Sequence, residues 1–158
     1  MKKYRYVTTE ALAKIARRAG IRHEQKRVRE AWEKGLFAIR SAGSGSGTSS
    51  YPKPDLIIFN KDGMIDLVQS KTTRKYHSYF GPADWESEVT SALRLRELGF
   101  QVRVWLDFTL FRLGRSASMN KWFRVDGHEE EYLSIKYVKV EKLIKFKWEK
   151  TPAIEQQP

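Results

Sequence analysis

The chain has 158 residues, of which 41% are hydrophobic and 13% aromatic, enough apolar material for one folded domain with its own core. Its 30 Lys and Arg residues against 19 Asp and Glu leave a net charge of +11, which favours a polyanionic partner, most simply nucleic acid. The absence of cysteine excludes disulfides, zinc–thiolate sites and cysteine nucleophiles. No apolar run resembles a membrane span or a signal peptide. We therefore expect a cytoplasmic protein (host cytoplasm if viral).

The order of the predicted elements indicates a small mixed sheet flanked by helices, an α/β fold. Glycines at 20, 35 and 99 mark the expected helix ends. We expect one domain over residues 1–150, with a core over about 20–107, a basic extension over 108–150 and a disordered tail over 151–158. The predicted elements are helices over 10–18, 22–34 and 83–98, strands over 36–40, 101–108 and 121–125, a hairpin over 51–71, a basic aromatic connection over 72–82, and a segment over 132–150 that fits either strand pairs or an amphipathic helix.

Residues 51–71 (YPKPDLIIFNKDGMIDLVQSK) are the most informative segment, because they predict two strands joined by an Asp62-Gly63 turn. Asp55 stands at the start of the first strand. Gln69 and Lys71 end the second strand and, being two residues apart, share a face. An acid, an amide oxygen and a lysine are therefore expected to meet at one end of the hairpin.

This combination suits metal-dependent cleavage of a phosphodiester. Divalent cations such as Mg²⁺ prefer hard oxygen ligands, often only a few of them from the protein. Asp55 is expected to bind the metal ion, and Gln69 offers one neutral carbonyl oxygen. Lys71 is expected to orient the attacking water or to neutralise charge that develops on the phosphate.

The sequence around these residues resembles the PD-(D/E)XK nuclease superfamily and, more narrowly, the archaeal-type Holliday junction resolvases. The resemblance covers residues from about 20 to 107, and its strength lies in the order of its elements. The residues that carry it are Glu24 in HEQKRVREAWEKG, the Gly-Leu-Phe at 35–37, the segment RSAGS at 40–44, Asp55 and Lys71.

The chain departs from the family pattern at Gln69, where a Glu is expected, at Gln25, where an Arg is expected, and in a longer Gly/Ser-rich loop over residues 41–50. Gln69 has three interpretations: a native residue, an introduced inactivating substitution, or a sign that the carboxylate has moved to the following helix. For the third, Glu86 is the candidate, with Asp84 and Glu88 as neighbours. We favour a native Gln69 with Glu24 or Glu86 restoring the charge.

The resemblance implies a restriction-endonuclease-like core and a Mg²⁺-dependent endodeoxyribonuclease, with Mn²⁺ as a substitute, that acts on branched DNA in recombination as a homodimer. Asp55, Gln69 and Glu24 would hold the metal ion. The alternatives are a nuclease for linear or flapped duplex DNA on the same fold, and a DNA-binding protein that has lost catalysis. The residues expected to contact DNA surround the site: Arg22, Lys26, Arg27, Arg40, Ser41, Ser44, Arg74 and Lys75.

Overall fold

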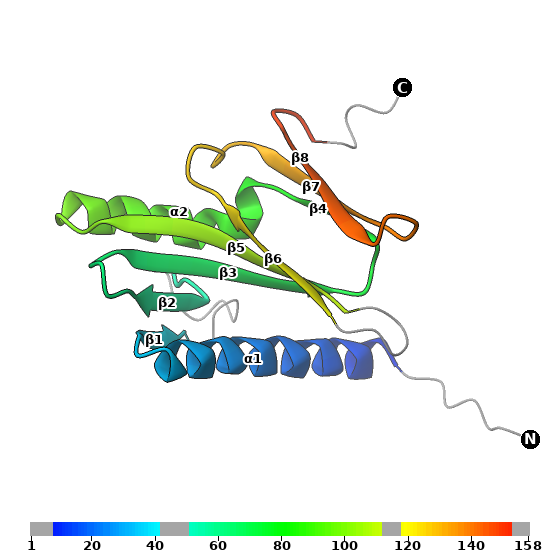
Figure 1. The fold of residues 1–158 in the computed structure, drawn as a ribbon, viewed down its shortest axis with the longest axis horizontal. Coiled ribbons are helices and arrows are strands. Elements are labelled where there is room, and N and C mark those ends of the chain that lie inside the picture. The colour runs from blue at the N-terminus through cyan, green and yellow to red at the C-terminus, as the bar shows by residue number, and fades with distance from the viewer. Residues whose placement is uncertain (1–7, 42–50, 112–117, 153–158) are drawn as a thin grey trace, which may run out of the picture.

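The computed structural model describes residues 8–41, 51–111 and 118–152 (Figure 1). None of the helices in these ranges is long and apolar enough to cross a membrane. In chain order the elements are α1 (Thr9–Glu33), β1 (Phe37–Arg40), β2 (Leu56–Phe59), β3 (Ile65–Thr73), β4 (His77–Phe80), α2 (Pro82–Glu97), β5 (Val102–Leu110), β6 (Met119–Arg124), β7 (Tyr132–Val138) and β8 (Leu143–Glu149).

The larger sheet has the strand order β1-β2-β3-β5-β6, in which β3 and β5 are parallel and the other neighbours antiparallel. Figure 1 shows α1 on one face of this sheet and α2 on the other. Side chains alternate accordingly: Leu67 packs in the cluster that contains Trp85 of α2, whereas Val68 packs in the cluster that contains Ala31 of α1. The expected α/β fold, a mixed central sheet flanked by helices, is confirmed.

A second sheet, with the order β4-β7-β8, lies on the α2 side of the larger sheet (Figure 1). Residues 132–150 thus form a pair of strands rather than an amphipathic helix. In β7, Leu133, Ile135 and Tyr137 are buried in the same cluster as Phe108 of β5. The basic extension therefore contributes to the main core.

Two boundary predictions are wrong. A single helix replaces the two expected over residues 10–18 and 22–34, because Gly20 keeps helical backbone and the helix continues to Glu33, just before the chain turns at Gly35, where φ is +78°. A glycine inside a helix costs about 1 kcal/mol relative to alanine, which a long packed helix tolerates. The connection expected over residues 72–82 contains the end of β3 and all of β4, which pairs with β7, a partner far away in the sequence.

The buried face of α2 leaves out two of its leucines: Leu93 and Leu98 are 56% and 66% exposed. The side chains that face the core are Trp85, Glu88 and Ala92, spaced three and four residues apart. A glutamate therefore occupies the buried face of this helix.

Candidate active site

The hairpin has the predicted geometry. Strands β2 and β3 pair antiparallel, with Leu56 opposite Val68 and Phe59 opposite Ile65. Gly63 adopts a φ of +84°, which favours glycine, and the Asp62 carboxylate accepts a hydrogen bond of 2.9 Å from the Met64 amide. This register carries the start of β2 alongside the middle of β3, which continues beyond Gln69 and Lys71 to Thr73.

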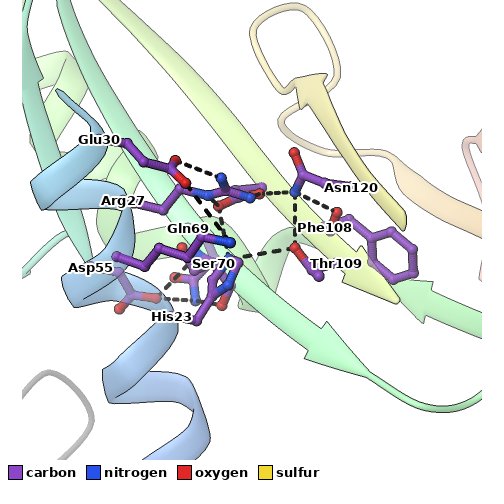
Figure 2. A network of polar contacts seen from close by, with 11 residues as sticks. His23, Arg27, Glu30, Asp55, Gln69, Ser70, Phe108, Thr109 and Asn120 are labelled. Atoms are coloured by element: carbon purple, nitrogen blue, oxygen red, sulfur yellow. Dashed lines mark hydrogen bonds and ion pairs between the residues drawn. The ribbon is translucent and has the colours of Figure 1, made fainter. Parts of the chain in front are cut away.

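Asp55 and Gln69 meet at that end of the hairpin. Gln69 Nε2 donates to Asp55 Oδ2 over 2.7 Å, and the Ser70 amide donates to the same oxygen over 3.3 Å (Figure 2). In this conformation Gln69 presents its NH₂ group to the carboxylate. The side-chain amide of Gln69 has to flip, exchanging the positions of Nε2 and Oε1, before Oε1 can face a cation beside Asp55.

Glu88, which was expected only as a neighbour of Glu86, lies against Asp55. Its side chain is fully buried, and its Oε1 accepts a hydrogen bond of 3.2 Å from the Asp55 amide. Its Oε2 is buried and has no hydrogen-bond partner within the described part of the chain. Burial and then the charge of Asp55 raise the pKa of Glu88 to about 7, an effect that Lys71 partly opposes.

Lys71 reaches toward the first turn of α2. Its Nζ lies 3.2 Å from Asp84 Oδ1, and both side chains are about one-third exposed. The other Asp84 oxygen accepts a hydrogen bond of 2.8 Å from the Gly81 amide at the helix start. Asp84 therefore holds the lysine next to the site while leaving it accessible to solvent.

The two other predicted carboxylates are placed differently. Arg40 Nε donates to Glu24 Oε2 over 2.9 Å. Burial raises the pKa of Glu24; the hydrogen bond from Arg40 opposes this shift, and the charge of Asp55 adds to it. Glu24 therefore lies close enough to Asp55 for the charge of Asp55 to affect its pKa, but its carboxylate is bound to Arg40. Glu86 is exposed on α2 and is not brought to the site, because the buried side of the helix passes through Glu88.

The available donors fit a hard divalent cation. Within residues 8–41, 51–111 and 118–152, no three Asp, Glu or His side chains converge as a ready set of metal ligands. Asp55 and Glu88 supply two carboxylates, and Gln69 can add a carbonyl oxygen. Mg²⁺ commonly takes one or two protein carboxylates and completes its shell with water and substrate phosphate. The unpartnered Glu88 oxygen is a further sign of the fit, since a buried carboxylate without a partner is costly.

A buried polar network attaches α1 to the sheet beside this site (Figure 2). Its centre is Asp107 of β5, which is fully buried. The carboxylate accepts hydrogen bonds from His23 Nε2 at 3.2 Å, Arg27 Nε at 2.8 Å and Asn120 Nδ2 at 2.5 Å. Burial alone would raise the pKa of Asp107, but the hydrogen bonds from His23, Arg27 and Asn120 lower it. Because its partners lie far apart in the sequence, only the tertiary structure reveals this network.

The basic residues expected to contact DNA fall into two groups. Arg22, Lys26 and Arg74 are exposed and line one pocket of about 470 Å³ next to His23. Arg27 also lines this pocket but is held in an ion pair with Asp107, and Arg40 is held in one with Glu24. The remaining candidates are Lys75, which is exposed, Ser41, whose amide donates to the Asp55 carbonyl over 3.1 Å, and Ser44, which lies outside the described residues.

Comparison with known proteins identifies the family. No curated protein matches the chain significantly. One similar solved structure is Archaeoglobus fulgidus Hjc, a Holliday junction resolvase from an archaeal hyperthermophile, at 28% identity over 66% of this chain and 75% of that chain, with a TM-score of 0.47. The model of the archaeal Holliday junction resolvase family (Hjc) matches residues 15–102, a range that includes Asp55, Gln69, Lys71 and Glu88. Since this match spans more than half of the sequence, the chain belongs to the archaeal Holliday junction resolvase family and is a structure-selective nuclease.

Proposed function

We propose that this endonuclease cleaves branched DNA with Mg²⁺ held by Asp55, Glu88 and Gln69, and that Mn²⁺ can substitute. The observation that carries the proposal is the fully buried Glu88 carboxylate, which has an unpartnered oxygen and lies against Asp55. Two carboxylates in such a place repel each other, and a divalent cation held by these residues would offset their charge. Glu88 thus takes the role that the sequence had suggested for Glu24 or Glu86.

The remaining residues act on the substrate. A cation held by Asp55, Glu88 and Gln69 would supply the activation of water and the polarisation of the phosphate oxygens that cleavage needs. Lys71 Nζ, held by Asp84 at 3.2 Å, is placed to orient the attacking water or to neutralise charge on the phosphate. Arg22, Lys26 and Arg74, which are exposed around the pocket that His23 also lines, would contact the backbone of the DNA. Glu24 acts indirectly, because it fixes Arg40 at the end of β1.

The test compares two glutamates on the same helix. Glu88→Gln keeps the size of the side chain but removes the charge, and Glu86→Gln is its matched control on the exposed face. We expect Glu88→Gln and Asp55→Ala to abolish Mg²⁺-dependent cleavage of a labelled four-way junction while retaining DNA binding, and Glu86→Gln to cleave like the unmodified chain. Circular dichroism establishes that each variant is folded. Full cleavage by Glu88→Gln would remove Glu88 from the metal site.

The substrate and the oligomeric state are tested separately. A panel of four-way junction, flapped and linear duplex DNA shows which shape is cleaved, and no cleavage of any of them would favour the DNA-binding protein that has lost catalysis. We also propose a homodimer, because a four-way junction offers two symmetric cleavage positions to a two-fold symmetric protein. Sedimentation analysis at micromolar concentration should give twice the chain mass, and a monomer with full junction cleavage would contradict the proposed dimer.

A further inference from the structure

A second pocket adjoins the residue that holds Lys71. It has a volume of about 520 Å³, within the usual range for small-ligand sites, and lies between the start of α2 and the smaller sheet. Asp84, whose Oδ1 is 3.2 Å from Lys71 Nζ, forms part of its wall. A group bound there would therefore lie next to the phosphate on which Lys71 is proposed to act.

This pocket depends on strands that lie outside the family match, which ends at residue 102. Tyr132 and Ser134 of β7 and Glu149 of β8 line it. The Tyr132 ring packs directly on the start of α2, because a Cβ atom at Gly81 would come within 2.6 Å of two of its ring atoms. The backbone of Gly81 is ordinarily extended, with φ of −148°, so this close approach is what requires a glycine there.

The lining of the pocket is aromatic and acidic. Tyr79 is 49% exposed, and its ring is held by His77, with ring centroids 4.5 Å apart and a hydrogen bond of 3.2 Å between Tyr79 Oη and His77 Nδ1. The charged side chains on the wall, Asp84 and Glu149, are both carboxylates, and none of the described lining residues is cationic. The wall offers a phosphate no cationic partner, whereas a nucleobase offers a flat face for stacking and N–H groups for the carboxylates.

The charges around the pocket still let DNA approach. Lys71 and Lys147, which do not line the pocket, pair with Asp84 and Glu149, each at 3.2 Å. These lysines bring positive charge close to the pocket, so a DNA backbone can pass along it while a base turns inward. We propose that this pocket binds one unpaired nucleobase adjacent to the cleaved phosphodiester.

The inference rests on the proposed function and gives a physical basis for shape selectivity. Extruding a base from a continuous duplex requires that it unpair and unstack, and this cost is lowest for bases that are already unpaired. Stacking on Tyr79 would then favour DNA with a loosened base beside the cleavage position, as at a branch point or a flap. A continuous linear duplex supplies no such base without the full cost of extrusion.

The experiment measures the coupling between one base and one tyrosine. Four-way junctions and flapped duplexes carry an abasic nucleotide at each position next to the branch in turn, and their affinity is measured by fluorescence anisotropy with Ca²⁺ in place of Mg²⁺. For the unmodified chain, one abasic position should weaken binding roughly 5- to 150-fold, the range for loss of one base–aromatic stack. In Tyr79→Ala the same abasic position should cause no further loss.

Two further variants sharpen the comparison. Ala83→Phe, at an exposed position of α2 that lines the pocket, should fill it and also remove the dependence on the base. Phe100→Ala is the matched control, since Phe100 is 51% exposed and lies outside the pocket, and it should keep the full dependence.

Equal abasic effects in the unmodified chain and in Tyr79→Ala, or no abasic effect at any position, would overturn the inference. Junction cleavage in Mg²⁺ without a base effect would leave the proposed function standing and remove the pocket from it. A base effect on flapped DNA without junction cleavage would support the pocket and contradict the proposed cleavage of junctions.

Discussion

Replacing Asp107 by asparagine tests whether the buried network holds α1 in place for catalysis. The substitution keeps the size of the side chain but removes the charge that faces His23 and Arg27, at a position that is fully buried. Breaking a buried pair on one side costs roughly 3–5 kcal/mol when the partner charge is left uncompensated, and Glu30, 2.8 Å from Arg27 Nη1, places the expected loss toward the lower end of that range. For a chain of this size, each kcal/mol lowers the melting temperature by about 2–4 °C, so we expect a decrease of about 6–20 °C.

A double-mutant cycle assigns this loss to the ion pair. Arg27→Gln, Asp107→Asn and their combination are compared by urea unfolding followed by circular dichroism. Because Arg27 Nε lies 2.8 Å from Asp107, the two losses should not add, with a coupling energy of about 0.5–3 kcal/mol. Glu97→Gln is the control, since its ion pair with Arg94 is exposed and should contribute little. Strictly additive losses would refute the pairing.

The same variant has a defined pH dependence. The pKa of Asp107 is lowered from its ordinary value of 3.8, so the unfolded chain binds more protons as the solution becomes acidic. The stabilisation from Asp107 should be fully present above about pH 3.8 and decrease below it, as pH approaches the folded-state pKa. The difference in stability between the unmodified chain and Asp107→Asn should therefore shrink below that pH, and a difference independent of pH would contradict the assignment.

Three further predictions concern catalysis and DNA binding. Gln69→Glu should leave Mg²⁺ affinity and cleavage, measured by calorimetry and single-turnover rates, without a gain, because Glu88 already supplies the second carboxylate; a clear gain in both would mean that Glu88 does not replace a carboxylate at position 69. Lys71→Ala should lower the single-turnover rate strongly with little change in Mg²⁺ affinity, whereas weaker DNA binding at an unchanged rate would make Lys71 a phosphate contact. If DNA binding engages roughly six phosphates, the logarithm of the binding constant should fall with the logarithm of salt concentration with a slope near −5. Replacing Arg22 and Arg74 together by alanine should reduce the magnitude of this slope by about 2. An unchanged slope would mean that the DNA backbone does not contact these two arginines.

The local part of the fold was predictable because its signals are local. The Asp62-Gly63 turn and the flanking apolar runs specify the β2–β3 hairpin, and its register then places Asp55 next to Gln69. Helix ends were less predictable, since Gly20 and Gly35 look alike in the sequence. Only Gly35 adopts a positive φ, because the chain must turn there to enter β1.

The smaller sheet could not be predicted from local patterns. The lysines of residues 132–150 recur at intervals of about three, which resembles the polar face of a helix. Burial instead alternates along β7, where Leu133, Ile135 and Tyr137 face the core and Lys136 faces solvent. That alternation depends on pairing with β4, which lies more than fifty residues earlier in the chain. Nonlocal pairing of this kind leaves little trace in a short window of sequence.

Glu88 could have been found from the sequence by helical periodicity. Trp85 and Ala92 are apolar positions three residues before and four residues after it, so a glutamate between them lies on the buried side of the helix. A buried glutamate requires a partner, and α2 follows the strand that carries Lys71 with only the short β4 between them. Glu86 is exposed because it lies about 200° around the helix from Glu88. The neutral Gln69 and the buried Glu88 are thus consistent with one explanation, in which the second carboxylate of the metal site comes from α2 rather than from β3.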